Sequence, residues 1–180
     1  MRFGVQFGGL YAPAAEVARL GAEAEATGFE SLWVPDSQML YRDPWATLAL
    51  LARETRRVRL GTLATNALTR HPAVTANAIL TLQELSGGRA ILGIATGDSA
   101  VRRIGARPVR LADFERALAE VRALLAGGAG ADGRFAIRFA AGAPPPVYVV
   151  ASGFRLLELA GRVADGGVVN VGAHPAVLGA

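Results

Sequence analysis

The chain has 180 residues, of which 52% are hydrophobic and 19% charged, and its formal net charge is +4. This composition predicts one folded domain with a sizeable core and excludes a disordered chain. Cysteine is absent, which excludes disulfides, zinc–thiolate sites and cysteine nucleophiles; all 19 basic residues are arginine, which excludes lysine as a general base or Schiff-base former.

The arginines are spread along the chain, apart from a cluster formed by Arg102, Arg103, Arg107 and Arg110. Nucleic-acid binding needs a basic patch or stripe, so we expect no nucleic-acid partner and interpret the cluster as a solvated loop, with an anion site as the alternative. Apolar runs are short, and strand-like sequence starts at Arg2 with no apolar leader. We therefore expect no membrane span and a cytoplasmic location.

Short strand-like runs alternate with amphipathic helices along the chain. The predicted strands are 2–8, 31–36, 58–64, 89–95, 147–152 and 167–172. The predicted helices are 13–28, 43–55, 72–85, 112–128 and 154–166. Asp43 followed by Pro44 is typical of a helix start, and Gly28 is typical of a helix end. The Arg-rich segment after the fourth strand is predicted as a loop, and 133–141 as a short hairpin.

Strands that are apolar along their length predict a parallel sheet covered on both faces. A doubly wound open sheet and part of a (β/α)₈ barrel both fit this alternation. The barrel is slightly favoured, because the first strand is not followed by the G-x-G-x-x-G of a dinucleotide-binding fold. In either fold, the functional residues lie at the carboxyl ends of the strands.

Every predicted strand becomes small or polar at its carboxyl end. The residues concerned are Gln6, Phe7, Gly8, Asp36, Ser37, Thr65, Asn66, Thr96, Gly97, Asp98, Ser99, Ser152, Gly153, Asn170 and Gly172. Helix caps and turns explain any single end, but six together predict a rim where a flat ligand lies against backbone. Asp36 and Asp98 are the two acids of this rim. Their functional interpretation is hydrogen bonding to a ligand or proton transfer, and their structural interpretation is helix capping and loop bracing.

Two other kinds of chemistry are disfavoured. His71 has no second histidine at metal-ligand spacing, and His174 lies in the tail, so we expect no metal site. No G-x-S-x-G sequence is present, so acyl transfer by a serine nucleophile has no support.

Four stretches of the chain resemble the bacterial-luciferase-like oxidoreductases. They are SLWVPD (31–36), GTLATNALTRHP (61–72), LQELSGGRAILGIATGDSAV (82–101), and VYVVASG with LELAGRVADGGVVNVG (147–153 and 157–172). The branch they resemble contains the methylene-tetrahydromethanopterin reductases and other coenzyme F420-dependent enzymes. This resemblance implies an α/β fold: a TIM-type barrel with about six of its eight βα units, forming a single domain over 1–180 that lacks the last strands.

The resemblance also implies a cofactor site across the strand ends, for coenzyme F420 or alternatively FMN. It implies a non-proline cis peptide at Leu63–Ala64, in a bulge beneath the cofactor ring. The implied cofactor-binding residues are Leu63, Ala64, Thr65, Asn66, Thr96, Gly97, Asp98, Ser99, Ala151, Ser152 and Gly153. Asp36, near the reactive face, and Asp98 are the candidate catalytic residues. Gln6 departs from the reductase branch, which has a carboxylate at that position.

In function, the resemblance implies hydride transfer between a deazaflavin and a small organic substrate. The alternatives are an FMN-dependent monooxygenase, a non-catalytic flavin- or F420-binding protein, and an inactive barrel fragment. A sheet of six strands has open edges and an uncovered apolar interior, so we also expect a homo-oligomer.

Overall fold

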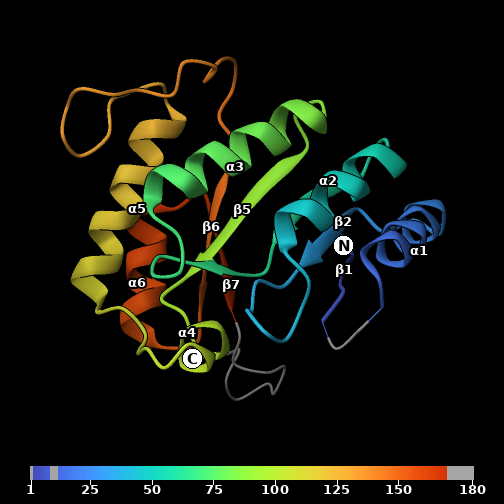
Figure 1. The fold of residues 1–180 in the computed structure, drawn as a ribbon, viewed down its shortest axis with the longest axis horizontal. Helices are drawn as coiled ribbons and strands as arrows, with labels where there is room; N and C mark the ends of the chain where they lie inside the picture. Colours follow the sequence, from blue (N-terminus) through green and yellow to red (C-terminus); the bar gives the residue numbers. More distant parts are fainter. Residues whose placement is uncertain (1, 9–11, 170–180) are drawn as a thin grey trace.

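The computed structural model describes residues 2–8 and 12–169, and Figure 1 shows a curled sheet with helices packed along its outer side. The strands are β1 Gly4–Gln6, β2 Ser31–Val34, β3 Arg59–Thr62, β4 Thr65–Asn66, β5 Ala90–Ala95, β6 Val147–Ala151 and β7 Gly166–Val169. The helices are α1 Ala14–Ala26, α2 Pro44–Glu54, α3 Pro72–Leu85, α4 Ser99–Arg103, α5 Leu111–Leu125 and α6 Phe154–Val163.

The order of the strands distinguishes the two architectures that the sequence allows. The strands lie in the order β1-β2-β3-β5-β6-β7, β4 pairs with β5, and every pairing is parallel. A doubly wound sheet reverses direction at a switch point, whereas a barrel adds its strands in chain order. The structure is therefore an incomplete TIM-type barrel, as the resemblance implies.

Three predicted elements differ from the structure. The third strand is divided into β3 and β4 around Leu63–Ala64. The Arg-rich segment, predicted as a loop, contains α4, because Ala100 and Val101 are buried and hold one helical turn in place. The hairpin predicted at 133–141 is wrong, since only one antiparallel bridge forms, between Ala129 and Ala136.

The failure of the hairpin has a physical cause. The segment is rich in glycine and alanine, and its two aromatic side chains, Phe135 and Phe139, are 72% and 44% exposed. Only Ile137 and Ala140 pack against the core, and only partly, so little stabilises a strand pair beyond its turn. The end of the last predicted strand, with Asn170 and Gly172, and His174 lie outside the described residues.

The core lies between the sheet and the helices. Alternate residues of the strands point outward and are fully buried, among them Leu32, Leu60, Leu92 and Val149. The helices meet them with Leu48, Leu51, Ile79, Phe114, Leu118 and Leu159. This arrangement follows from the apolar spacing of the helices, which gives each of them one buried face.

The inner face of the sheet, by contrast, is only half-buried in the described part of the chain. The indole of Trp33 lies against Gly61, where a Cβ atom would come within 2.6 Å of the ring. The ring centroids of Trp33 and Tyr148 are 6.3 Å apart. Gly93 lies closest to a neighbouring strand, since a Cβ there would be 2.0 Å from the carbonyl oxygen of Thr62. The expectation of a sheet covered on both faces is therefore met only on the outer face.

Gly93→Ala should destabilise the fold by about 2–3 kcal/mol, because the new methyl group would collide with backbone that cannot move aside. Gly161→Ala is the matched control: this α6 glycine has nothing within 4 Å of a Cβ, and alanine should stabilise the helix by up to about 1 kcal/mol. Urea unfolding measures the free energy of unfolding of both variants. Equal stabilities for the two variants would contradict the close approach of β3 and β5.

Candidate functional site

A cleft of about 330 Å³ lies at the carboxyl ends of the strands. It is lined by Gln6, Asp36, Leu63, Ala64, Thr65, Asn66, Ala95, Gly97, Asp98, Ser99, Ala100, Val150, Val168 and Val169. A second hollow of about 730 Å³ adjoins it and shares Ala95, Gly97, Asp98 and Val150. The structure thus brings together residues at the ends of strands from β1 to β7, from Gln6 to Val169.

The floor of the cleft is the break between β3 and β4. The Leu63–Ala64 peptide bond is cis, which confirms the bond implied by the resemblance. The Leu63 N–H donates to the carbonyl oxygen of Val34 on β2 (2.9 Å), and its carbonyl oxygen accepts from Gln6 Nε2 (2.6 Å). Beyond the break, Thr65 and Asn66 pair with β5. Backbone therefore faces the cleft here, in place of core side chains.

Asn66 presents an unused hydrogen-bond donor beside this floor. Its Oδ1 accepts from the N–H groups of Leu68 (3.0 Å) and Thr69 (2.9 Å), which fixes the side chain in a turn. Its Nδ2 is buried and has no partner in the described part of the chain, although Asn66 is only 1% exposed. Buried donors are normally paired, so this unpaired atom is an exception, and it belongs to a residue that lines the cleft.

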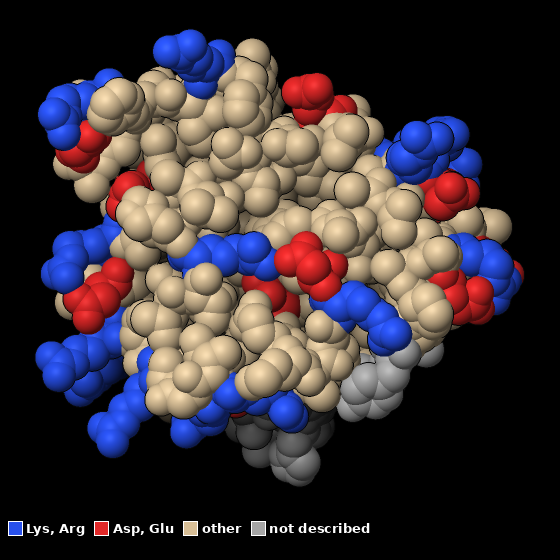
Figure 2. All heavy atoms as spheres, in the orientation of Figure 1, with Lys and Arg blue, Asp and Glu red and all other residues tan. Residues whose placement is uncertain are grey.

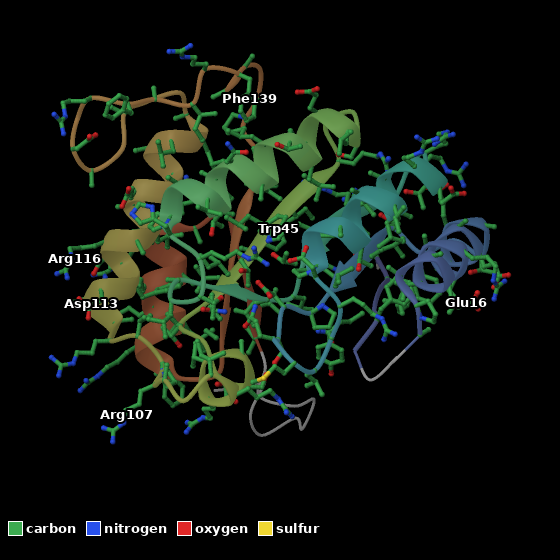
Figure 3. All side chains as sticks on the ribbon, in the orientation of Figure 1. Glu16, Trp45, Arg107, Asp113, Arg116 and Phe139 are labelled. Carbon is green, nitrogen blue, oxygen red and sulfur yellow. The ribbon has the colours of Figure 1, made fainter. Side chains whose placement is uncertain are left out.

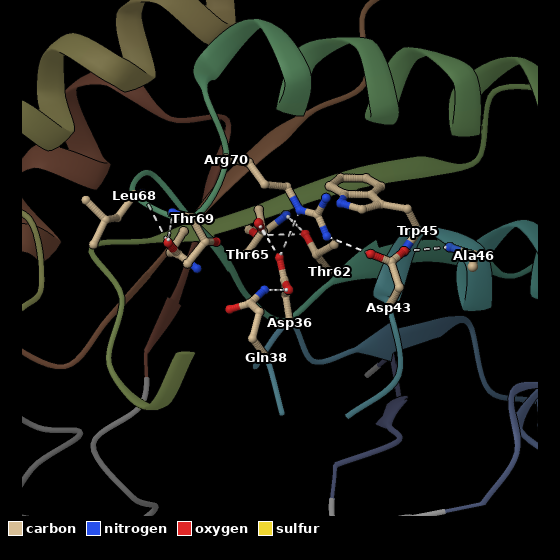
Figure 4. A network of polar contacts seen from close by, with 12 residues as sticks. Asp36, Gln38, Asp43, Trp45, Ala46, Thr62, Thr65, Leu68, Thr69 and Arg70 are labelled. Carbon is tan, nitrogen blue, oxygen red and sulfur yellow. Dashed lines mark hydrogen bonds and ion pairs between the residues drawn. The ribbon is translucent and has the colours of Figure 1, made fainter. Parts of the chain in front are cut away.

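Asp36 is the most buried acid of the site, with its side chain 1% exposed. Gln38 Nε2 donates to its Oδ1 (2.7 Å), and Thr65 Oγ1 donates to its Oδ2 (2.7 Å). Arg70 adds an ion pair, with Nε 3.6 Å from Oδ2 (Figure 4). Both carboxylate oxygens are thus occupied, which supports the bracing role that the sequence left open for this residue.

Arg70 connects this carboxylate to the start of α2. Its NH2 group donates to Asp43 Oδ2 (2.7 Å), while Asp43 Oδ1 accepts from the N–H groups of Trp45 (2.9 Å) and Ala46 (3.0 Å). Figure 4 shows the indole of Trp45 beside the guanidinium group. Burial acts to raise the pKa of Asp43, but hydrogen bonds from Ala46 and Arg70 outweigh it, so the pKa is lowered and the cap stays ionised.

Asp98, the second predicted acid, has a different environment. Its side chain is 82% exposed and pairs with Arg102 Nε at 2.7 Å. It makes no side-chain cap to α4, so the capping alternative is not observed. Beside it, Ser99 Oγ lies 2.9 Å from Ser37 Oγ, which joins the loops after β2 and β5. Gly97, at φ +94°, allows the chain to turn between the end of β5 and the start of α4.

The second hollow is lined by the remaining predicted cofactor-binding residues, Thr96, Ala151, Ser152 and Gly153. The first turn of α6 supplies three further lining residues, of which Phe154 is 85% exposed and Arg155 is charged. The amino-terminal end of a helix carries unpaired N–H groups and a partial positive charge. This part of the rim therefore suits a polar or anionic group.

Some residues of the site were not selected from the sequence. Gln38 and Arg70 act on Asp36 from loops, where strand-end reasoning gives no signal. Val150 and Val168 line the cleft because they are inward-facing residues of β6 and β7, which the period of two along a strand could have identified. His71 caps α3, with Nδ1 accepting from the N–H of Ala73 (3.2 Å).

Over residues 2–8 and 12–169, no group of three or more acidic or histidine side chains is placed to hold a metal ion. No helix in the same ranges is long and apolar enough to cross a membrane. Arginines are scattered over the face in Figure 2, and Arg107 points away from the protein in Figure 3, as a solvated loop requires.

Comparison with known proteins matches residues 2–180 to the family described as luciferase-like monooxygenase. The chain belongs to the luciferase-like monooxygenase family. It is 38% identical over 186 residues to a 5,10-methylenetetrahydromethanopterin reductase of Methanolobus tindarius, covering 97% of this chain and 55% of that protein. It is 36% identical over 171 residues to an F420-dependent glucose-6-phosphate dehydrogenase of Beutenbergia cavernae, covering 83% of this chain and 50% of that one.

The fold of this luciferase-like chain also matches solved structures. The coenzyme F420-dependent tetrahydromethanopterin reductase of Methanopyrus kandleri superposes with a TM-score of 0.75 at 28% identity, over 94% of this chain and 55% of that one. The chain thus spans about half the length of the relatives it matches.

Arg70→Met should destabilise the protein by about 2–3 kcal/mol, because it leaves the buried Asp36 carboxylate with neutral donors only. Arg102→Met is the matched control: it removes the pair with Asp98, whose side chains are 67% and 82% exposed, and should cost less than about 0.5 kcal/mol. Thermal and urea unfolding of both variants measure the difference. A loss for Arg70→Met no larger than the control's would contradict a structural role for the ion pair.

Proposed function

We propose that this chain binds coenzyme F420 at the carboxyl ends of its strands and belongs to an oxidoreductase that transfers a hydride between this deazaflavin and a small organic substrate. The buried, unpaired Nδ2 of Asn66 beside the backbone floor of the cleft carries the proposal. A dehydrogenase relative and a reductase of known structure, both named as F420-dependent, support it.

The residues present fit a flat ring system with a polar tail. In the proposal, Leu63, Ala64 and Thr65 hold the ring from below, and Asn66 donates to its polar edge. The Gly97–Ser99 turn lies along the ring edge, and Asp98 remains a candidate for contact with the reacting groups. Thr96, Ala151, Ser152 and Gly153 hold the tail in the second hollow, which the first turn of α6 borders. Volumes of about 330 and 730 Å³ lie in the range of small-molecule sites.

The deazaflavin, when bound, supplies the hydride chemistry itself. The protein's own residues orient the ring and exclude water from one of its faces. Asp36 contributes by fixing Thr65 and the loop after β2 through two hydrogen bonds and the ion pair with Arg70, so in this proposal it positions the site.

Two alternatives remain. FMN could occupy the same cleft, as the description of the family as monooxygenases suggests, and the activity would then be oxygenation. A chain that binds the cofactor without turnover is the second alternative, because the matched length is about half that of the relatives. The single domain over 1–180 and the cytoplasmic location also remain predictions.

Coenzyme F420 added to the purified chain should be bound at micromolar concentration, with quenching of its fluorescence. Asn66→Asp keeps the acceptor for Leu68 and Thr69 but replaces the free donor with an oxygen, so it should weaken binding about tenfold. Asn77→Asp, on the exposed face of α3, is the matched control and should bind as the parent does. FMN is titrated in parallel. Failure of both cofactors to bind would refute the proposal.

We also propose that the chain self-associates through its open sheet. β1 and β7 are the edge strands of the described sheet, and Trp33, Tyr148, Val150 and Val168 on its inner face are only half-buried. Multi-angle light scattering should therefore give a mass of at least two chains. Val169→Lys, on β7, should lower it, whereas Val74→Lys, at a similarly exposed position on α3, should not. A stable monomer of the parent chain would contradict this.

A further inference from the structure

Gln6 reaches across the sheet to the floor of the cleft. It is the last residue of β1 and aligns with Trp33 of β2, yet its side chain contacts the segment that follows β3. Its Nε2 donates to the carbonyl oxygen of Leu63 at 2.6 Å. The N–H of Leu63 is held separately by Val34 of β2 at 2.9 Å. The two polar groups of Leu63 are therefore fixed by two different strands.

The contact restricts the residue type that position 6 can hold. The partner atom is a carbonyl oxygen, which only accepts hydrogen bonds. A carboxylate placed at the same distance would set two acceptors against each other, so glutamate could make this contact only in its protonated form. An amide donates at every pH, and a thioether of similar length, as in methionine, does not donate.

Gly8 leaves room for the amide on its other side. A Cβ atom at Gly8 would lie 3.2 Å from Gln6 Oε1 and 3.4 Å from Gln6 Cδ. A side chain at position 8 would therefore press on the amide, and glycine leaves this space open. The hydrogen bond to the carbonyl oxygen of Leu63 is what directs the amide nitrogen towards it, although Gln6 as a whole is exposed.

We propose that Gln6 is a positioning residue whose amide sets the direction of the Leu63 carbonyl group in the wall of the cleft, and so determines cofactor affinity as a hydrogen-bond donor. Gln6, Leu63 and Ala64 line the same cleft, so a change in this carbonyl reshapes the floor beside the proposed ring site. The effect on affinity rests on the proposed function, whereas the effect on the carbonyl group does not.

Two variants of the intact chain separate donation from packing. Gln6→Met keeps the length without a donor, and Gln6→Glu donates only when protonated. F420 dissociation constants are measured between pH 5.0 and 7.5, each relative to the parent chain at the same pH. At pH 7.5 both variants should bind about tenfold more weakly. Towards pH 5.0, Gln6→Glu should recover at least threefold, and Gln6→Met should not recover.

A second readout needs no cofactor. The ¹³C resonance of the Leu63 carbonyl should move upfield in Gln6→Met, and in Gln6→Glu at pH 7.5, and should return towards the parent value in Gln6→Glu at pH 5.0. Circular dichroism confirms that each variant folds. An unchanged resonance in both variants overturns the inference. Changed resonances with unchanged affinities overturn its link to the cofactor, and a parent chain that binds no cofactor refutes the proposed function while the resonance still decides the role of Gln6.

Discussion

The buried carboxylate of Asp36 is the constraint on which the rest of the site depends. A carboxyl group whose side chain is 1% exposed is tolerated only when its polar atoms find partners within the protein. These partners come from three places: Gln38 in its own loop, Thr65 on β4, and Arg70 before α3. Because Arg70 also binds the cap of α2 at Asp43, one buried charge fixes the relative positions of the loops after β2 and β4. The floor of the cleft is consequently held by electrostatics and by backbone pairing together.

A second constraint acts on the inner face of the sheet. The indole of Trp33 covers Gly61 of β3 and approaches Gly93 of β5, and a Cβ atom at Gly61 would collide with it. The same glycine at 93 lets Thr62 come close enough for its Oγ1 to donate to the Gly93 carbonyl oxygen (2.7 Å) and to accept from the Gly93 N–H (3.2 Å). A side chain thereby replaces part of the backbone ladder at the point where β3 ends. The break between β3 and β4, which forms the cleft floor, begins directly after Thr62.

Much of the fold could be predicted from the sequence, because helix faces, caps and apolar strands are local signals. Asp43 and Pro44 begin α2 as predicted, and Gly28, at φ +98°, follows the end of α1. The strand-end rule also identified half of the residues that line the cleft, since parallel strands in a barrel must bring these ends together, whereas Leu63 and Ala64 came from the family resemblance. The rule could not predict which side chains form hydrogen bonds with one another. The contact of Gln6 with Leu63 joins residues 57 apart, and that of Thr65 with Asp36 joins residues 29 apart. Such pairs depend on strand register and loop path, which no local pattern encodes.

The two acids that the sequence placed together have opposite environments, and this difference defines the chemical character of the site. Asp36 is buried with both carboxylate oxygens hydrogen-bonded, and Asp98 is an exposed residue paired with Arg102. Besides these acids, the polar groups that line the described cleft include the amides of Gln6 and Asn66, the hydroxyl group of Ser99 and backbone of the strand ends. These groups donate and accept hydrogen bonds without titrating near neutral pH. Such a site is suited to holding and orienting a molecule that carries its own reactivity, which is what a redox cofactor requires of its protein.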